Sequence, residues 1–191
     1  MRRDLIHLPA LKSSFLSCEK DIETILRKLF IESRPYSDEL KRLLIISAKD
    51  CLTNPQYQEK IDSFSIADMV KEGYIKITPK IPLKEHEQIK SYIILSFDNF
   101  IPNGTNTEFR DCIVNIDVIC HMDYWDIGDF KLRPFKIIGF IDGLLDKNRL
   151  SGIGTLNFAG CNQLVLDENL AGYALMYRAV HGTDDRLEKK E

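Results

Sequence analysis

The side chains best suited to chemistry in this chain are acidic, histidine and cysteine residues near the middle, with His181 close to the C-terminus. Asp117 and His121 share one face of an alternating strand, but four strand residues span roughly 13 Å, too far to share a metal or a proton. Cys120 and His121 point to opposite faces because successive strand side chains alternate. A metal site would need His181 to approach from another strand, so we expect no metal.

Glycine-rich and catalytic motifs are equally sparse. Gly152-Ile153-Gly154 lacks a correctly placed third glycine and opens no helix, so it does not fit a nucleotide-binding turn. The chain contains no GxSxG elbow, no HExxH and no paired-carboxylate motif. We therefore expect no cofactor and no enzyme activity, although an intracellular enzyme with dispersed site residues stays open as an alternative.

Composition narrows the function further. The five cysteines are scattered without a CxxC pair, which predicts small, buried, reduced side chains. They are Cys18, Cys51, Cys112, Cys120 and Cys161. A net charge of −3 argues against a protein whose main task is to grip phosphate backbones. It does not exclude contact with DNA that must slide past, where mild repulsion helps.

The N-terminal segment carries Arg2 and Arg3, but His7, Pro9 and Lys12 interrupt the residues after them, so no signal peptide is expected. No apolar run approaches the roughly 18 to 20 residues of a membrane span, so no membrane partner is expected. Synthesis in the cytoplasm is the natural expectation. A length of 191 residues suits one domain with an appendage.

Residues 1–73 are predicted to form an N-terminal helical region. The second of three expected helices runs towards Leu52 and stops at Asn54-Pro55. The third pairs its capping serine with Asp68 and is closed by Gly73. The expected N-caps of the three helices are Ser17, Ser37 and Ser65.

Residues 74–182 are predicted to form an α+β core, followed by a charged tail at 183–191. A helix opened by Pro134 follows the long central strand, and Gly139 and Gly143 give it a flat strip for close packing. The predicted strands are Tyr74–Thr78, Ser91–Phe97, Cys112–Met122, Leu150–Phe158 and Tyr173–Val180. The expected fold class is N-terminal helices followed by a mixed, mainly antiparallel sheet with one packed helix.

Two connections in this core are predicted to be irregular. Pro102-Asn103-Gly104 is a turn signal within a polar segment, Asn99 to Glu108, that should be mobile in the isolated chain. The segment from Gly160 to Gly172 is expected to join the last two strands.

From Ser91 to His181 the chain resembles the neck proteins of tailed bacteriophages, in particular tail-terminator and head–tail joining proteins. Those subunits consist of a helix, a sheet with a long hairpin, a second helix and closing strands, and they assemble into rings. The residues that carry the resemblance are Phe109-Arg110-Asp111, Ile116–His121, Trp125, Arg133–Ile137, Ile153–Leu156 and Gly172-Tyr173.

The resemblance implies a structural virion protein located in the neck. A homo-oligomeric ring, six-fold for a terminator, would end the tail tube and join it to the head connector or adaptor protein. DNA would pass through the lumen without sequence-specific binding. The expected interface residues are Asn103, Gly104, Tyr124, Trp125 and Phe130. A cytosolic interaction module unrelated to phage is the other alternative.

Overall fold

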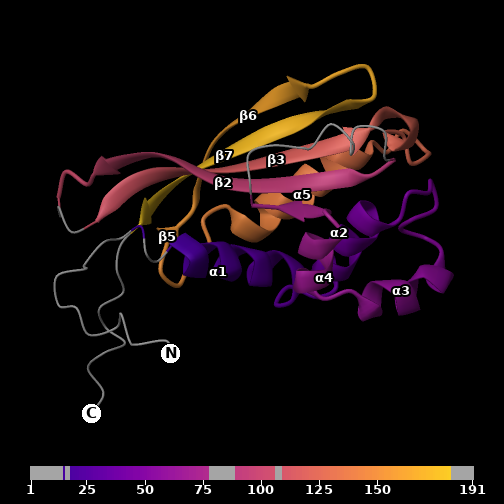
Figure 1. Ribbon diagram of the computed structural model, residues 1–191, viewed down its shortest axis with the longest axis horizontal. Coiled ribbons are helices and arrows are strands. Elements are labelled where there is room, and N and C mark those ends of the chain that lie inside the picture. Colours follow the sequence, from indigo (N-terminus) through magenta and orange to yellow (C-terminus); the bar gives the residue numbers. More distant parts are fainter. Residues whose placement is uncertain (1–14, 16–17, 78–88, 106–108, 182–191) are drawn as a thin grey trace, which may run out of the picture.

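The computed structural model describes residue 15 and residues 18–77, 89–105 and 109–181. It has the predicted α+β architecture, with helices first and a sheet after them (Figure 1). The helices are α1 (Cys18–Phe30), α2 (Tyr36–Ile45), α3 (Gln58–Ser63), α4 (Ile66–Lys71) and α5 (Arg133–Leu145), with 3-10 turns η3 (Pro55–Tyr57) and η5 (Met122–Tyr124).

The sheet has the order β1-β2-β3-β7-β6, in which every neighbouring pair is antiparallel except β1 and β2. This confirms the mixed, mainly antiparallel sheet. Its strands are β1 (Ile75–Lys76), β2 (Ser91–Pro102), β3 (Arg110–His121), β6 (Asn157–Val165) and β7 (Leu170–His181), and β4 (Arg149–Leu150) and β5 (Gly154–Thr155) form a separate two-stranded sheet.

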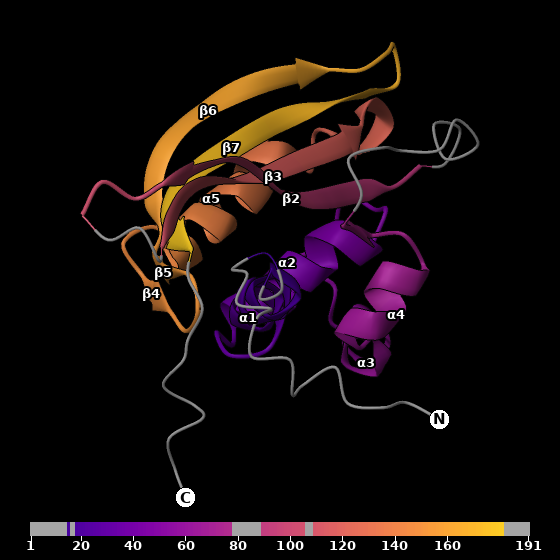
Figure 2. The same cartoon turned by 60° about the vertical axis from the view of Figure 1, so that its left-hand side comes forward.

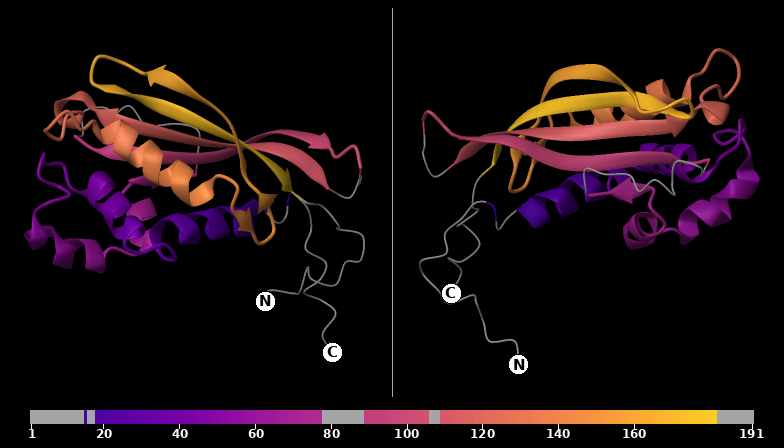
Figure 3. Two further views of the ribbon diagram at one scale, coloured as in Figure 1. Left: turned by 180° about the vertical axis from the view of Figure 1, so that it is seen from behind. Right: turned by 45° about the horizontal axis from the view of Figure 1, so that its top comes forward.

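Helices cover one face of the large sheet, which arches over them (Figure 2). Helix α5 packs on β3 and β7, on the same side as α1 and α2 (Figure 3). The alternation along β3 explains this layering, because every second residue from Cys112 to Cys120 is buried in the helix-side core. Strand β2 is buried on both faces at its start. Tyr92 and Ile94 join Ile119 there in a small cluster on the face of the sheet away from the helices.

The central pairing requires a glycine. A Cβ atom on Gly172 would lie 1.7 Å from the carbonyl oxygen of Val118, so no side chain fits at this point of the antiparallel β3–β7 pair. The long hydrogen-bonded ladder between these strands therefore depends on Gly172, which is also one of the residues that carry the resemblance to neck proteins.

Of the three helices predicted from the sequence, the third is confirmed closely. Ser65 caps α4 in a capping box with Asp68, and Gly73 follows with φ of +80°. The second helix was predicted too long. Helix α2 ends at Ile45 rather than near Leu52, and Ser37 lies inside the helix rather than capping it. The expected cap of α1, at residue 17, lies outside the described residues.

Asn54-Pro55 was expected to stop a helix, and it opens one instead. The Asn54 side chain accepts a hydrogen bond from the N–H of Gln56 (3.0 Å), and Pro55 occupies the first turn of η3, which leads into α3. Asparagine and proline are as suitable for starting a helix as for ending one.

The region after α5 also differs from its prediction. Gly152 and Gly154 have φ of +87° and +75°, so the expected strand is broken into the short β4–β5 hairpin. The segment expected to be a connection holds most of β6, which pairs with β7 from Asn157 to Val165.

One hydrophobic core joins the helices to the sheet. It contains Ile25 and Phe30 of α1, Ile116 of β3 and Ile141 of α5, each at most 1 % exposed. The helical region thus packs as part of the same unit as the sheet.

Candidate functional site

The expected interface residues fall into two groups at opposite ends of β3. Asn103 and Gly104 lie at the turn that joins β2 to β3, whereas Tyr124, Trp125 and Phe130 lie between β3 and α5. A strand of 12 residues spans roughly 36 Å at about 3.3 Å per residue. The two groups therefore cannot form one patch on a single subunit.

At the hairpin end, the expectation of a mobile loop from Asn99 is wrong for its first residues. Asn99 to Pro102 belong to β2, and Phe100 packs against Phe15, with ring centroids 4.9 Å apart. The Asn103 side chain donates to Asp111 Oδ1 (2.7 Å) and so fixes the predicted turn. Residues 106–108 lie outside the described part of the chain.

At the opposite end, Trp125 is half-buried against Tyr173 (6.5 Å between centroids), and Phe135 contacts the same ring at 4.9 Å with the ring planes tilted by 40°. Tyr124 is also half-buried, and its carbonyl accepts a hydrogen bond from Arg133 Nε (2.9 Å). Trp125 and Phe135 thus contact Tyr173 of their own subunit, whereas Phe130 is 103 % exposed.

Phe130 sits at the tip of a short loop that we call the Phe130 loop, Asp126–Leu132. Gly128, Asp129 and Phe130 have φ of +88°, +51° and +59°. A non-glycine residue in this region costs on the order of 1–3 kcal/mol, and a phenylalanine there is unusual. Full exposure also forgoes the roughly 1.5–3 kcal/mol that burying the ring would contribute.

The loop is nevertheless well braced. Its ends form a β-bridge between Asp126 and Leu132, and the N–H of Gly128 donates to Asp126 Oδ1 (2.8 Å). Backbone hydrogen bonds of 2.9 Å link Ile127 to Lys131 and Lys131 to Gly128. The strained, fully exposed phenylalanine is therefore held in place rather than free to fold back.

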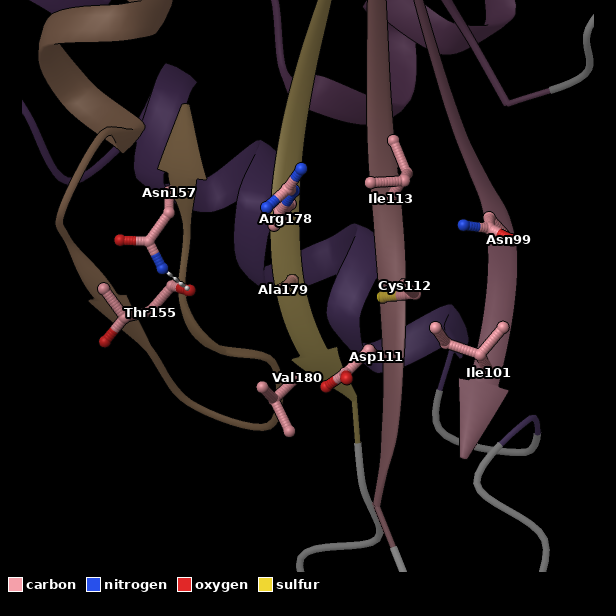
Figure 4. Close-up of a pocket in the computed structure, with 10 residues that line it drawn as sticks. All are labelled: Asn99, Ile101, Asp111, Cys112, Ile113, Thr155, Asn157, Arg178, Ala179 and Val180. Carbon is pink, nitrogen blue, oxygen red and sulfur yellow. Dashed lines mark hydrogen bonds between the residues drawn. The ribbon is translucent and has the colours of Figure 1, made fainter. Parts of the chain in front are cut away.

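Near the hairpin end of the sheet lies a recess of about 490 Å³, formed across β2, β3, β7 and the β5–β6 region (Figure 4). Ile101 and Val180 are 48 % and 41 % exposed, and Asp111 and Arg178 bring charges of opposite sign to it. The full lining is Asn99, Ile101, Asp111, Cys112, Ile113, Thr155, Asn157, Arg178, Ala179 and Val180. Sequence reasoning missed this recess because it is assembled from segments far apart in the chain.

A third surface is the outer edge of the sheet at β6. Its nine residues include no charge and no proline, and seven positions in the burial pattern are exposed, Val165 at 70 %. Helix α5 packs on β3 and β7 and leaves β6 beyond it (Figure 3). Among the described residues no strand pairs with the outer edge of β6.

Gly139 and Gly143 do not provide the expected close packing. Both are exposed on α5, and a Cβ added to either meets no atom within 4 Å. The buried face of α5 is formed by Ile137, Ile141 and Leu145 instead.

The residues considered for chemistry lie apart. His121 pairs with Leu170 and His181 with Arg110, so the two histidines occupy opposite ends of the β3–β7 pair. The described residues contain no group of three or more His, Cys, Asp or Glu positioned for a metal ion. Asp117 is half-buried on the face away from the helices, and burial raises the pKa of its carboxyl.

The cysteines are only partly as expected. Cys51, Cys112 and Cys120 are buried, and burial raises the pKa of the Cys112 thiol to about 12 and that of Cys120 to about 11. Such thiols are poor nucleophiles because little thiolate is present at neutral pH. Cys161, however, is exposed on β6, and Cys18 is half-exposed.

No described helix has the length and apolar character needed to cross a membrane. No curated protein sequence matches this chain. Among solved structures, a chain from the virion of a native gene transfer agent particle aligns with a TM-score of 0.42 and 17 % identity. The alignment covers 65 % of this chain and 90 % of that one. A protein-family model matches residues 37–179, and the chain therefore belongs to the YomW family, which is phage-related.

Proposed function

We propose that this protein is a structural component of a phage virion, located in the neck. It forms a ring that ends the tail tube and joins it to the head connector. Membership of a phage-related family supports the virion class. The resemblance of Ser91–His181 to tail-terminator and head–tail joining proteins supports the position in the neck.

The observation that carries an assembly role is the unprotected edge of β6. Natural sheets usually protect an exposed edge with charged residues, prolines or a covering element, since a free edge pairs with other chains. Strand β6 is uncharged, lacks proline and is exposed on both faces. A strand of a tail-tube or head-connector protein can add to such an edge by main-chain hydrogen bonding.

A ring needs a second kind of contact, between copies of the same chain. In a cyclic ring each copy uses two different patches, one for each neighbour. The Phe130 loop and the hairpin end, roughly 36 Å apart along β3, are two separate patches that can serve as such a pair. We propose six copies, with DNA passing through the lumen and held by no specific contact, consistent with a net charge of −3.

The test is the protein content of particles. We expect mass spectrometry of purified virions to detect this chain, and electron microscopy to place it as a ring between head and tail. Deleting the gene should leave filled heads and separate tails. Normal, infectious particles that lack the protein would rule out the proposed function.

A further inference from the structure

We propose that the Phe130 loop is the connector between copies, and that Phe130 inserts into the recess lined by Ile101, Ile113 and Val180 on the next copy. The inference rests on the proposed ring and names the contact that would build it. Each copy would contribute its loop to one neighbour and its recess to the other.

The loop has the properties of an anchor that is formed before binding. Phe130 is 103 % exposed, and its backbone is held at φ of +59° by the Asp126–Leu132 bridge and the hydrogen bonds across the loop. Aromatic side chains that fill a pocket on the partner commonly supply most of the binding energy of an interface. A rigid loop loses little conformational entropy on docking, which favours association.

The recess has the room and part of the apolar surface that a phenyl ring needs. Its volume of about 490 Å³ lies within the usual range of binding pockets and leaves room for a phenyl ring. Ile113 lines it from β3, and Ile101 and Val180 belong to the large hydrophobic side chains that this chain exposes (Figure 4). Most of the other lining residues are polar: Asn99, Asp111, Thr155, Asn157 and Arg178. A mixed recess of this kind can pack its aliphatic side chains against the ring while its polar rim contacts the loop backbone.

The charges around the two surfaces also match. Asp129 and Lys131 stand on either side of Phe130 and form an exposed ion pair with each other (3.7 Å), which costs little to exchange for new partners. Asp111 and Arg178 line the recess. When Phe130 occupies the recess, one orientation brings Asp129 towards Arg178 and Lys131 towards Asp111. Complementary charge favours that orientation over its reverse and fixes how the copies meet.

The occupant is a second copy because one chain carries both surfaces and cannot join them itself. The loop follows the C-terminal end of β3, whereas Asp111 and Ile113 lie near its N-terminal end. A contact between two different patches repeats from copy to copy, and it closes into a ring where the rotation between neighbouring copies allows closure. The same geometry leaves β6 free for other partners.

The test uses two complementary variants of the full chain. Phe130→Asp removes the aromatic ring but keeps the recess, and Val180→Lys obstructs the recess but keeps the ring. We expect native mass spectrometry to show that each variant alone has lost the wild-type oligomer. Mixed in equal amounts, they should form a one-to-one dimer that grows no further, because only one intact loop and one intact recess can meet.

Ile31→Asp is the matched control, because Ile31 is 47 % exposed and belongs to neither the Phe130 loop nor the recess lining; it should assemble like the wild type. Circular dichroism should show that all three variants fold. A Phe130→Asp protein that keeps the wild-type oligomer overturns the inference. If the Phe130→Asp and Val180→Lys proteins do not form the one-to-one dimer when they are mixed, the inference is overturned too.

A photo-crosslinking phenylalanine analogue at position 130, introduced during phage growth, extends the test to assembled particles. It also tests the contact if the purified wild-type protein is monomeric. We expect crosslinks to peptides from the recess of a second copy. Crosslinks to a different virion protein overturn the inference but leave the neck function standing. Absence of the chain from particles refutes the neck function, and the mixing experiment then decides the contact by itself.

Discussion

Arg133 is 1 % exposed, yet its guanidinium group donates hydrogen bonds to four backbone carbonyls. Three of them belong to α2 and the residues after it, and the fourth is the Tyr124 carbonyl before α5. The acceptors are Leu43, Ile46 (3.0 Å), Ala48 (2.7 Å) and Tyr124 (2.9 Å). The positive charge also lies at the C-terminal end of α2, where the helix dipole favours it. This arrangement satisfies the backbone carbonyls at the C-terminal end of α2 and just after it, and no local sequence signal reveals it.

Replacing this arginine should destabilise the whole fold. Arg133→Met leaves several buried carbonyls without a donor, so we expect a loss of about 3–5 kcal/mol in the free energy of unfolding. Urea denaturation measures it. The control is Lys136→Met on the exposed side of the same helix, which should change stability by about 0.5 kcal/mol or less. Equal effects of both substitutions would contradict this account of Arg133.

Asp117 should make stability depend on pH. Burial raises its pKa in the folded state, so the folded protein holds the proton more tightly than the unfolded chain. The neutral carboxyl therefore contributes stability that is fully present below the unfolded pKa, near 3.9, and is lost as the pH rises through the folded pKa.

We therefore expect Asp117→Asn to raise the free energy of unfolding at pH 7 and to have little effect at pH 3. Denaturation at the two pH values measures the difference, with Glu168→Gln, an exposed substitution, as the control. A variant less stable than the wild type at pH 7 would mean that the charged form of Asp117 is favoured in the folded protein.

At the scale of elements, features set by neighbouring residues could be predicted from the sequence, whereas pairing between distant segments could not. The capping box at Ser65, the proline at the start of α5 and the alternation of β3 are each local, and each prediction held. Strand β6 was missed because its small and uncharged polar residues look like a connection. Only pairing with β7 makes it a strand.

The interface prediction had the same limit. Aromatic composition pointed to the Phe130 loop, but composition does not show that Tyr124 and Trp125 are half-buried while Phe130 projects fully. The recess depends on β2, β3, β7 and the β5–β6 region meeting in space. No stretch of sequence contains it.

A charge on β6 should prevent this edge from pairing. Asn162→Lys places a lysine in the middle of an exposed, uncharged strand, a common natural protection against edge pairing. We expect unchanged folding by circular dichroism, slower aggregation of the isolated subunit, and fewer joined heads and tails when the variant is supplied to a deletion phage. Glu168→Lys, outside the strand, is the control. Normal joining with the β6 variant would show that this edge is not used in assembly.

At the scale of the whole molecule, one core links the helical region to the sheet, and unfolding should be cooperative. The chain has a single tryptophan, Trp125, which packs beside Tyr173 of the sheet. Its fluorescence reports on that end of the sheet, and circular dichroism at 222 nm reports mainly on the helices. We expect the two denaturation curves to coincide. Loss of helix signal at lower denaturant would show that residues 1–73 unfold separately.

The placement of the Phe130 loop and the recess at opposite ends of β3 also has a mechanical consequence. Tension applied between these two points runs along the strand, which is hydrogen-bonded to β7 along its whole length and to β2 along most of it. The bonds on both sides are then loaded together in shear, instead of breaking one after another as in an opening zipper. A subunit pulled through these two points therefore resists stretching along the direction in which its sheet is strongest. In the proposed ring, this is the direction in which neighbouring copies would pull on each other.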